Sequence, residues 1–280
     1  MNIVSTLSNV INYYRDKRLV SRVYKERFGW PINWKNPKRF TEKIQVFKIS
    51  EAAEKLWKYV DKFEVRSYIE QQIGKEYLTK LYGVYNSPEE IDFNVLPKAF
   101  VLKTTHGSGW NIICPDKSKL DIAEAKIKLA GWLSQNYYQS YGKERQYKLA
   151  IPRIICEEYL DTPEKGLYDF KFYCFHGEPK FINLIQDRIG QTKKAMYELP
   201  WKKSELQPWD AKGDINMPRP KDLDVMMELS RKLAQPFEQV RVDLYNVDGR
   251  ILFGELTFTC SGGLKLYNPD RFDELFGSYW

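Results

Sequence analysis

One stretch near the C-terminus, residues 240–259 (VRVDLYNVDGRILFGELTFT), constrains the fold more than any other. Both halves are rich in β-branched, aliphatic and aromatic residues, and an Asp-Gly turn dipeptide divides them, so we predict a β-hairpin. Strand side chains alternate between faces, which puts Arg241 and Asp243 together on the first arm. On the second arm, Glu255 and Thr257 share a face in the same way. Charges inside an apolar hairpin need an explanation, because burying an unpaired carboxylate is costly.

Two interpretations of these charges are open. Arg241 and Glu255 could form a cross-strand ion pair on a solvated face. Alternatively, Asp243 and Glu255 could bind a cation, because Mg²⁺ usually takes one or two carboxylates together with substrate phosphates. A three-residue loop with a left-handed Gly249 would place the two carboxylates on one face. A two-residue loop would place them on opposite faces and exclude the site.

Composition limits the class of protein. At 280 residues the chain makes one large domain or two small ones, and no apolar run approaches the ~20 residues that a membrane helix needs. The N-terminus lacks a basic segment and a cleavage site, so we expect no signal peptide. The four cysteines form no Cys-x-x-Cys pair and there are only two histidines. This argues against a zinc site and a disulfide framework, and for a cytoplasmic protein.

The formal net charge of +7 favours anionic partners, such as a nucleotide, a nucleic acid, an acidic glycan or an anionic membrane surface. No five-residue basic block concentrates this charge, so we expect no nucleic acid partner. Membrane contact is expected to be at most peripheral, at the inner membrane face.

The pattern along the chain indicates an α+β protein. Residues 1–95 look mainly helical and include one helix from Ala52 to Ile73. After residue 95, strands and helices alternate. The predicted strands are 99–103, 110–114, 151–160, 168–175 and 179–186, and the predicted helices are 121–138 and 221–235. Residues 187–213 look irregular.

Lys103 ends a predicted strand and is followed by a polar, Gly-bearing turn at 104–109. An ammonium and backbone N–H groups placed in this way could surround phosphate oxygens. A surface Lys beside an ordinary hairpin turn explains the same residues. The pattern is not a Walker A motif, because no Gly-Lys-Thr/Ser follows the glycines.

Two further strand segments carry charge. The strand end that begins at Glu157 could hydrogen-bond an adenine edge through its carboxylate and backbone, or could simply be solvated. Asp169 and Lys171 are two residues apart and therefore share a strand face. One could meet a ribose and the other a phosphate, or the two could belong to a cross-strand ion pair.

The order of these pieces is more informative than any one piece. A Lys with a flexible loop, an acidic strand end, and a late Arg-x-Asp with Glu-x-Thr follow one another as in the ATP-grasp superfamily. The chain resembles the TupA-like ATP-grasp enzymes of bacterial surface-polysaccharide synthesis over roughly residues 25–275. The segments that carry the resemblance are PKAFVLKTTHGSGWNIICPDKS, ICEEYL, YDFKFYCFHGEPKFINLIQDR and RVDLYNVDGRILFGELTFTCSGGL.

The resemblance implies an ATP-grasp fold, in which two α+β subdomains clasp ATP, preceded by the mainly helical region 1–95. Residues 96–160 would form the small subdomain, and residues 161–280 the large subdomain with the Mg²⁺, ATP and acceptor sites.

The resemblance also assigns nucleotide-binding residues. Lys103 matches the lysine on the α- and β-phosphates, and Lys62 matches a second phosphate lysine. The loop that covers the phosphates is matched by His106, Gly107, Ser108 and Gly109. The adenine-holding hinge and the ribose-binding acid are matched by Glu157, Tyr159, Leu160 and Asp169.

The resemblance assigns residues of the hairpin to metal binding and to phosphoryl transfer. Asp243 and Glu255 match the Mg²⁺ carboxylates, and Thr257 stands where many relatives carry Asn. Arg241 matches the arginine that stabilises the phosphate being transferred. The resemblance therefore implies an ATP-dependent carboxylate–amine ligase that acts through an acyl phosphate.

By the same resemblance, the acid is expected to be a uronic acid of a capsule, O-antigen or similar glycan, free or nucleotide- or lipid-linked, and the amine an amino acid or amino alcohol. Arg188 could hold a carboxylate through two hydrogen bonds. Near it in the chain are other candidates for the acceptor site, namely Asn183, Asp187 and Lys193. Tyr197, Trp201 and Trp209 could stack on a sugar or pack at the surface.

A glycosyltransferase or a sugar kinase of the same polymers is the alternative. A glycosyltransferase often carries an Asp-x-Asp metal motif on a loop. The one such motif here, Asp222 to Asp224, lies at a predicted helix start, where the helix dipole favours acids. A kinase would release no amide and need no amine.

Overall fold

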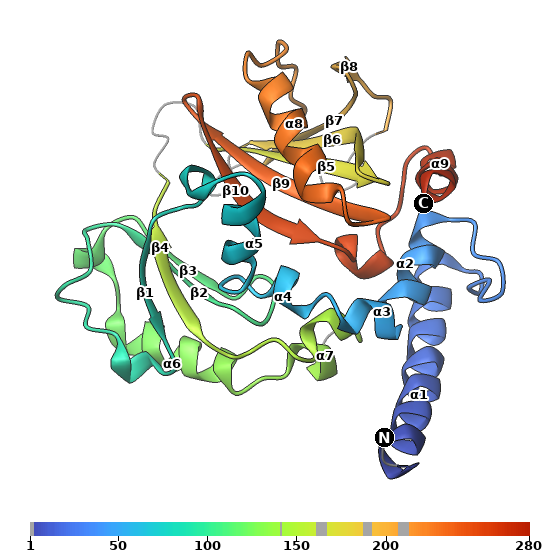
Figure 1. Ribbon diagram of the computed structural model, residues 1–280, viewed down its shortest axis with the longest axis horizontal. Helices are drawn as coiled ribbons and strands as arrows, with labels where there is room; N and C mark the ends of the chain where they lie inside the picture. Colours follow the sequence, from blue (N-terminus) through green and yellow to red (C-terminus); the bar gives the residue numbers. More distant parts are fainter. Residues whose placement is uncertain (1–2, 141, 161–166, 187–191, 207–212) are drawn as a thin grey trace.

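The computed structural model describes residues 3–140, 142–160, 167–186, 192–206 and 213–280. Two antiparallel sheets face each other across the molecule (Figure 1). The smaller sheet has the strand order β1-β4-β2-β3, and the larger has the order β10-β9-β5-β6-β7-β8. The expected α+β architecture is therefore confirmed.

The strands of the smaller sheet are β1 (Leu81–Tyr85), β2 (Phe100–Thr104), β3 (Asn111–Cys114) and β4 (Ile154–Glu158). Those of the larger sheet are β5 (Tyr168–Phe175), β6 (Glu178–Gln186), β7 (Lys193–Glu198), β8 (Lys202–Lys203), β9 (Gln239–Val247) and β10 (Arg250–Thr257). The helices are α1 (Ile3–Phe28), α2 (Phe40–Lys48), α3 (Glu51–Glu54), α4 (Trp57–Val60), α5 (Val65–Gln72), α6 (Ile122–Leu133), α7 (Tyr137–Ser140), α8 (Leu223–Ala234) and α9 (Arg271–Tyr279).

The larger sheet is covered on both faces. On one face, apolar side chains of α5 and α8 pack against β5, β6, β9 and β10. On the other face, α2 and α9 pack an aromatic cluster around Phe40, Tyr173 and Phe276. Because α2 and α9 cover only part of this second face, the polar residues of β5, β9 and β10 occupy the rest of it.

The helix predicted from Ala52 to Ile73 is broken into α3, α4 and α5. The second of the two breaks follows α4, where Asp61 Oδ1 accepts hydrogen bonds from the backbone N–H groups of Phe63 (2.9 Å) and Glu64 (3.1 Å). Such side-chain bonds compete with helical ones. The prediction of one helix was wrong here, and the turn that replaces it carries Lys62.

Three strands lie in segments of the chain where the sequence predicts none. Strand β1 lies within the first 95 residues but pairs with β4, so the smaller sheet begins before residue 95. Strands β7 and β8 lie in the stretch predicted to be irregular, and β7 pairs with β6 along six residues. Strand β8 is the edge strand of the larger sheet and has only two residues, too few to show a periodic pattern.

Candidate functional site

The register of the β9–β10 hairpin decides the first question posed by the sequence. Its loop has two residues, Asp248 (φ 52°) and Gly249 (φ 93°). An unbroken ladder would then place Asp243 and Glu255 on opposite faces. A β-bulge at Gly254 adds one residue, so Glu255 pairs directly with Asp243. The loop-length criterion was wrong because it assumed a ladder without a bulge.

The bulge position needs a glycine. A Cβ atom at Gly254 would lie 3.1 Å from the carbonyl oxygen of Asp243 and 3.2 Å from the ring of Tyr245. A larger residue would therefore press on the strand that carries the site.

The strand pairing aligns one polar row across the larger sheet. The row runs Glu255, Asp243, Lys171 and Asn183, on β10, β9, β5 and β6. The Lys171 ammonium donates to Asp243 and lies 2.9 Å from an oxygen of Asp169. Asp169 and Asp243 are each only 1% exposed, whereas the Glu255 side chain is 47% exposed. The row is therefore a buried charge cluster that reaches the surface at Glu255.

Arg241 holds the two metal-site candidates together. Its guanidinium donates to both carboxylate oxygens of Asp243 (2.7 Å each) and to Glu255 (2.7 Å). It also donates to the Thr257 hydroxyl (3.0 Å), which donates to Glu255 (2.9 Å). The cross-strand ion pair therefore exists, but the face is not simply solvated, since the Arg241 side chain is 12% exposed.

These contacts set the charge states. Burial alone would raise the pKa of Glu255, but Arg241 and then Lys171 and Lys62 outweigh it and lower the pKa to about 2. Burial alone would lower the pKa of Arg241, but Asp243 outweighs it and the pKa is raised. Glu255 and Arg241 are therefore both charged near neutral pH.

A second charge cluster lies on the smaller sheet. The Glu157 carboxylate accepts from Lys103 (2.8 Å), Arg66 (2.7 Å) and Thr79 (2.9 Å). Burial opposes ionisation of Glu157, but Lys103 and then Arg66 outweigh it and lower its pKa. The pKa of Lys103 is raised, because Glu157, Tyr245 and Glu255 outweigh the effect of burial.

The two clusters lie within electrostatic reach of each other. Burial lowers the pKa of Lys62 to about 8, and the charges of Glu255, Lys103 and Glu157 also act on its ammonium. Its ammonium donates to the carbonyl oxygen of Gly107, and its backbone N–H to Thr105 (3.2 Å). The turn after α4 thus joins the phosphate-loop candidate to both sheets.

The loop at 104–109 places its side chains unequally. The His106 ring is buried, packs on Trp110 at 5.1 Å and lies 3.2 Å from the carbonyl oxygen of Trp132, so it faces the interior. Gly107 has no room for a Cβ atom, which would lie 2.5 Å from the Trp110 ring. Ser108 and the left-handed Gly109 (φ 77°) lie at the outer end of the turn.

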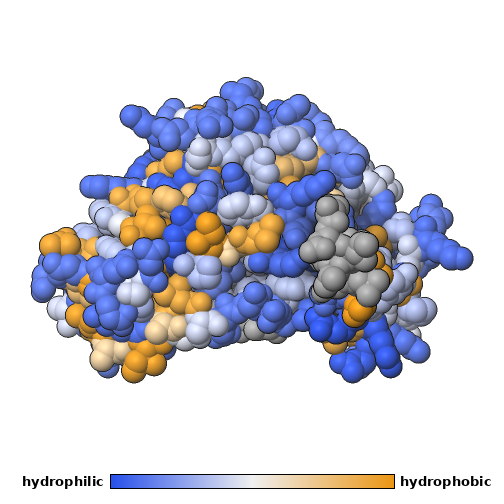
Figure 2. Space-filling model, turned by 60° about the horizontal axis from the view of Figure 1, so that its bottom comes forward, coloured by the Kyte–Doolittle hydropathy of each residue, from blue (hydrophilic) through white to orange (hydrophobic). Residues whose placement is uncertain are grey.

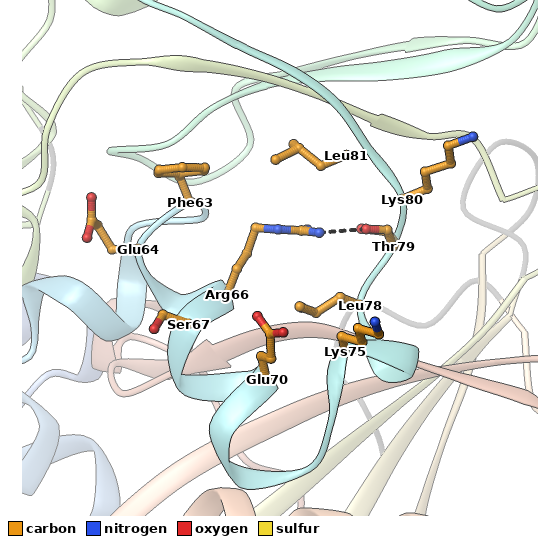
Figure 3. Close-up of a pocket in the computed structure, with 10 residues that line it drawn as sticks. All are labelled: Phe63, Glu64, Arg66, Ser67, Glu70, Lys75, Leu78, Thr79, Lys80 and Leu81. Carbon is orange, nitrogen blue, oxygen red and sulfur yellow. Dashed lines mark hydrogen bonds between the residues drawn. The ribbon is translucent and has the colours of Figure 1, made fainter.

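Sequence reasoning missed Arg66 and Thr79. Arg66 follows Lys62 by four residues, a spacing that would have suggested a shared face on a helix. Arg66 and Thr79, which both donate to Glu157, line a cavity of about 500 Å³ (Figure 3). Its lining is Phe63, Glu64, Arg66, Ser67, Glu70, Lys75, Leu78, Thr79, Lys80 and Leu81.

An apolar surface beside Lys103 was also missed. Ile113 on β3 pairs with Val101 on β2, which pairs with Glu157, so all three share the sheet face of Lys103. Ile113 is 47% exposed. The hinge candidates Tyr159 and Leu160 directly follow β4 and are half-buried. A second ion pair, Glu158 with Arg250 (2.8 and 3.0 Å), joins this hinge to the hairpin.

A family model for TupA-like ATP-grasp proteins matches residues 42–280. The chain belongs to this family. The family expected from the sequence, and with it the ATP-grasp fold, is therefore confirmed, as is ATP as the nucleotide of such proteins.

The chain is also similar to solved structures of low sequence identity. D-alanine–D-alanine ligase from Bacillus anthracis, complexed with ATP, shares 17% identity, with 71% of this chain and 54% of that chain covered and a TM-score of 0.43. The ligase PsnB, complexed with a minimal precursor, shares 11% (72% and 53% covered, TM-score 0.40). N5-carboxyaminoimidazole synthase from Aspergillus clavatus shares 13% (71% and 44%, TM-score 0.39). The chain spans about half the length of these proteins. No curated protein matches.

The residues of this TupA-like chain fit a magnesium ion. Across the described ranges, no group of three or more His, Cys, Asp or Glu side chains could hold a metal. Mg²⁺ does not need such a group, because it takes one or two carboxylates and completes its shell with water and phosphate oxygens. The adjacent carboxylates of Asp243 and Glu255, with the Thr257 hydroxyl, supply that donor set.

The acceptor candidates are only partly placed. Asp187, Arg188 and Trp209 lie outside the described residues. Asn183 is 7% exposed, and its Oδ1 has no hydrogen-bond partner among the described residues.

The aromatic candidates for sugar stacking face each other instead. Tyr197 is buried, its ring stacks on Trp201 at 4.1 Å, and its hydroxyl donates to Ile215 (3.1 Å). Lys193 begins β7 at the exposed end of that strand. Packing therefore accounts for this aromatic pair.

Two further expectations concern the alternative function and the membrane. Asp222 occupies the N-cap position of α8, without a capping hydrogen bond from its side chain, and Asp224 lies in the first turn, in agreement with the helix-start interpretation. Asp224 pairs with Arg219 (2.5 Å), and Asp222 accepts from Asn246 (3.0 Å). Within the part of the chain that the structure describes, no helix is both long enough and apolar enough to span a bilayer.

Proposed function

We propose that this protein is an ATP-dependent carboxylate–amine ligase that forms an amide through an acyl phosphate. Family membership supports ATP as the phosphoryl donor. The observation that carries the proposal is the row created by the Gly254 bulge, which pairs Glu255 with Asp243 beside Lys171 and Arg241.

The nucleotide would lie between the two sheets. Lys103 and Lys62 would hold the phosphates, and the Gly107–Gly109 turn would cover them. The base would rest on the half-buried Val101 and the exposed Ile113, with the hinge at Tyr159 and Leu160 on its edge. Asp169 would meet the ribose.

The metal would bind to Asp243 and Glu255, assisted by Thr257. When bound, Mg²⁺ neutralises phosphate charge and orients the phosphoryl group for in-line transfer. Without a metal, Arg241 and Lys171 donate to the Asp243 carboxylate. Once a metal binds that carboxylate, the two cations would donate to phosphate oxygens instead.

The chemistry follows from this charge arrangement. A substrate carboxylate oxygen attacks the γ-phosphorus, an O–P bond forms, and the bond to ADP breaks. Arg241, Lys103 and Lys171 stabilise the spread negative charge, so positioning and electrostatics supply most of the catalysis. The amine nitrogen then attacks the acyl carbon and loses its proton, and inorganic phosphate leaves. No protein nucleophile is required.

The substrate class is the finer part of the proposal. We take the acid to be a uronic acid of a bacterial surface-polysaccharide precursor and the amine to be an amino acid or amino alcohol. The net charge of +7 suits an anionic sugar. Asn183 lies at the end of the polar row, and its amide oxygen has no partner among the described residues, so it would accept a hydrogen bond from a substrate hydroxyl or amine. Arg188 is kept as a candidate for the carboxylate.

The test measures ADP release with Mg²⁺ and a panel of uronic acids and amines. Wild type is compared with Asp243→Ala and Glu255→Ala. The control variant is Glu89→Ala, which removes an exposed carboxylate distant in sequence from both site residues. ADP that requires both acid and amine, and is lost only in the site variants, supports the ligase. ADP released with a sugar alone would indicate a kinase, and consumption of a nucleotide-sugar without ATP turnover would indicate a glycosyltransferase.

A further inference from the structure

Helix α1 presents an outward face that no other described segment covers. It projects from the body, with its N-terminal end farthest away (Figure 1). Its inward face is anchored: Asp16, Val20 and Tyr24 are buried, and the Tyr138 hydroxyl donates to Asp16. The outward face is therefore a fixed surface of a well-anchored helix.

Four cations follow one line along this face. Arg15, Arg18, Arg22 and Lys25 are all exposed, and their spacing of three and four residues places them on one side of the helix. They span about 15 Å at 1.5 Å per residue. Glu26 lies 3.9 Å from Arg22 and offsets one of these charges. The line remains strongly positive.

Apolar side chains continue the same face toward the N-terminus. Val10, Ile11 and Tyr14 are 48%, 60% and 64% exposed. Isolated exposed apolar residues are ordinary, but these three lie within about one turn of each other and adjoin Arg15 and Arg18. Figure 2, which brings the lower side of Figure 1 forward, shows hydrophobic and hydrophilic residues interspersed over this side of the molecule, with hydrophilic residues prevailing at its right-hand end.

We propose that the outward face of α1 docks the protein on an anionic lipid bilayer. Val10, Ile11 and Tyr14 would enter the boundary between headgroups and acyl chains, and the four cations would meet lipid phosphates. Interfacial helices combine these two features. A polyanion such as nucleic acid or an acidic polysaccharide would neutralise the cations but leave the three apolar side chains in water.

The proposal does not depend on the ligase activity, so its test uses binding alone. Full-length protein is sedimented with vesicles of pure phosphatidylcholine or with vesicles containing roughly one-third phosphatidylglycerol, at low and high salt. Each cation near an anionic surface strengthens partitioning about fivefold. The Arg15→Gln/Arg18→Gln/Arg22→Gln variant should therefore partition about a hundredfold more weakly.

Two further variants separate the features. Ile11→Ser/Tyr14→Ser removes apolar contact and keeps every charge, and it should also weaken binding. Lys55→Gln/Lys119→Gln/Lys221→Gln removes three exposed cations elsewhere and should bind as wild type does. Equal binding to neutral vesicles, no binding to anionic ones, full binding by Ile11→Ser/Tyr14→Ser, or an equal loss in the lysine control would each overturn the proposal. Circular dichroism of each variant confirms that α1 remains folded.

Discussion

Replacing Lys171 with Met tests whether the polar row is a coupled buried charge cluster. The ammonium lies 2.9 Å from Asp169 and donates to Asp243, and both carboxylates are 1% exposed. Arg241 still neutralises Asp243 in the variant, but Asp169 loses its ion pair with Lys171. Removing one partner of a buried pair costs about 3–5 kcal/mol. We expect Lys171→Met to lower the free energy of unfolding by about 3 kcal/mol.

The double variant separates charge from packing. Asp169→Asn/Lys171→Met removes both members of the pair, so it should lose only about 1–2 kcal/mol, with a coupling energy of about 1–2 kcal/mol between the two sites. Urea denaturation followed by fluorescence measures these values without any substrate. Lys180→Met, an exposed lysine on the neighbouring strand, should change stability by less than about 0.5 kcal/mol. Strictly additive effects of the two single changes would refute the coupled-cluster reasoning.

Three further predictions concern the site. Gly254→Ala should lower the ATPase rate about tenfold, because its Cβ would press on the backbone of Asp243; Gly131→Ala, in open space on α6, should leave the rate unchanged. Burial lowers the pKa of Lys48 to about 8, below the ordinary lysine value of 10.5. Between these two pH values the folded state binds fewer protons than the unfolded chain. The free energy of unfolding should therefore rise with pH across this range. Lys48→Met should remove that rise in urea titrations, by up to about 3 kcal/mol. Arg66→Met should raise the KM for ATP. Without Arg66, the ion pair between Glu157 and Lys103 becomes stronger, and Lys103 is less available to the phosphates. An unchanged KM in steady-state assays would contradict this role of Arg66.

Several structural features could be predicted because their causes are local. Alternating residues and an Asp-Gly turn predicted the hairpin, and Asp121 does cap α6 through the N–H of Glu124 (2.9 Å), as a capping-box start suggests. The candidate residues Arg241, Asp243, Glu255 and Thr257 were named from spacing and resemblance, and the structure brings them together.

Other features could not be predicted, because distant partners decide them. Helix propensity favours a continuous helix from Ala52 to Ile73, yet Asp61 ends it, and Lys62 reaches Gly107. The partners of Glu157 are far apart in the chain, as Arg66 and Lys103 show.

The sequence by itself determined the family, the strand and helix content around the site, and which charged side chains share a strand. Those properties depend on neighbouring residues and on the period of the backbone. Only the tertiary structure decided the register of the hairpin. A glycine within a strand suggests a bulge, but the bulge at Gly254 is set by pairing with β9. The bulge shifts the register by one residue, and that shift brings Glu255 opposite Asp243.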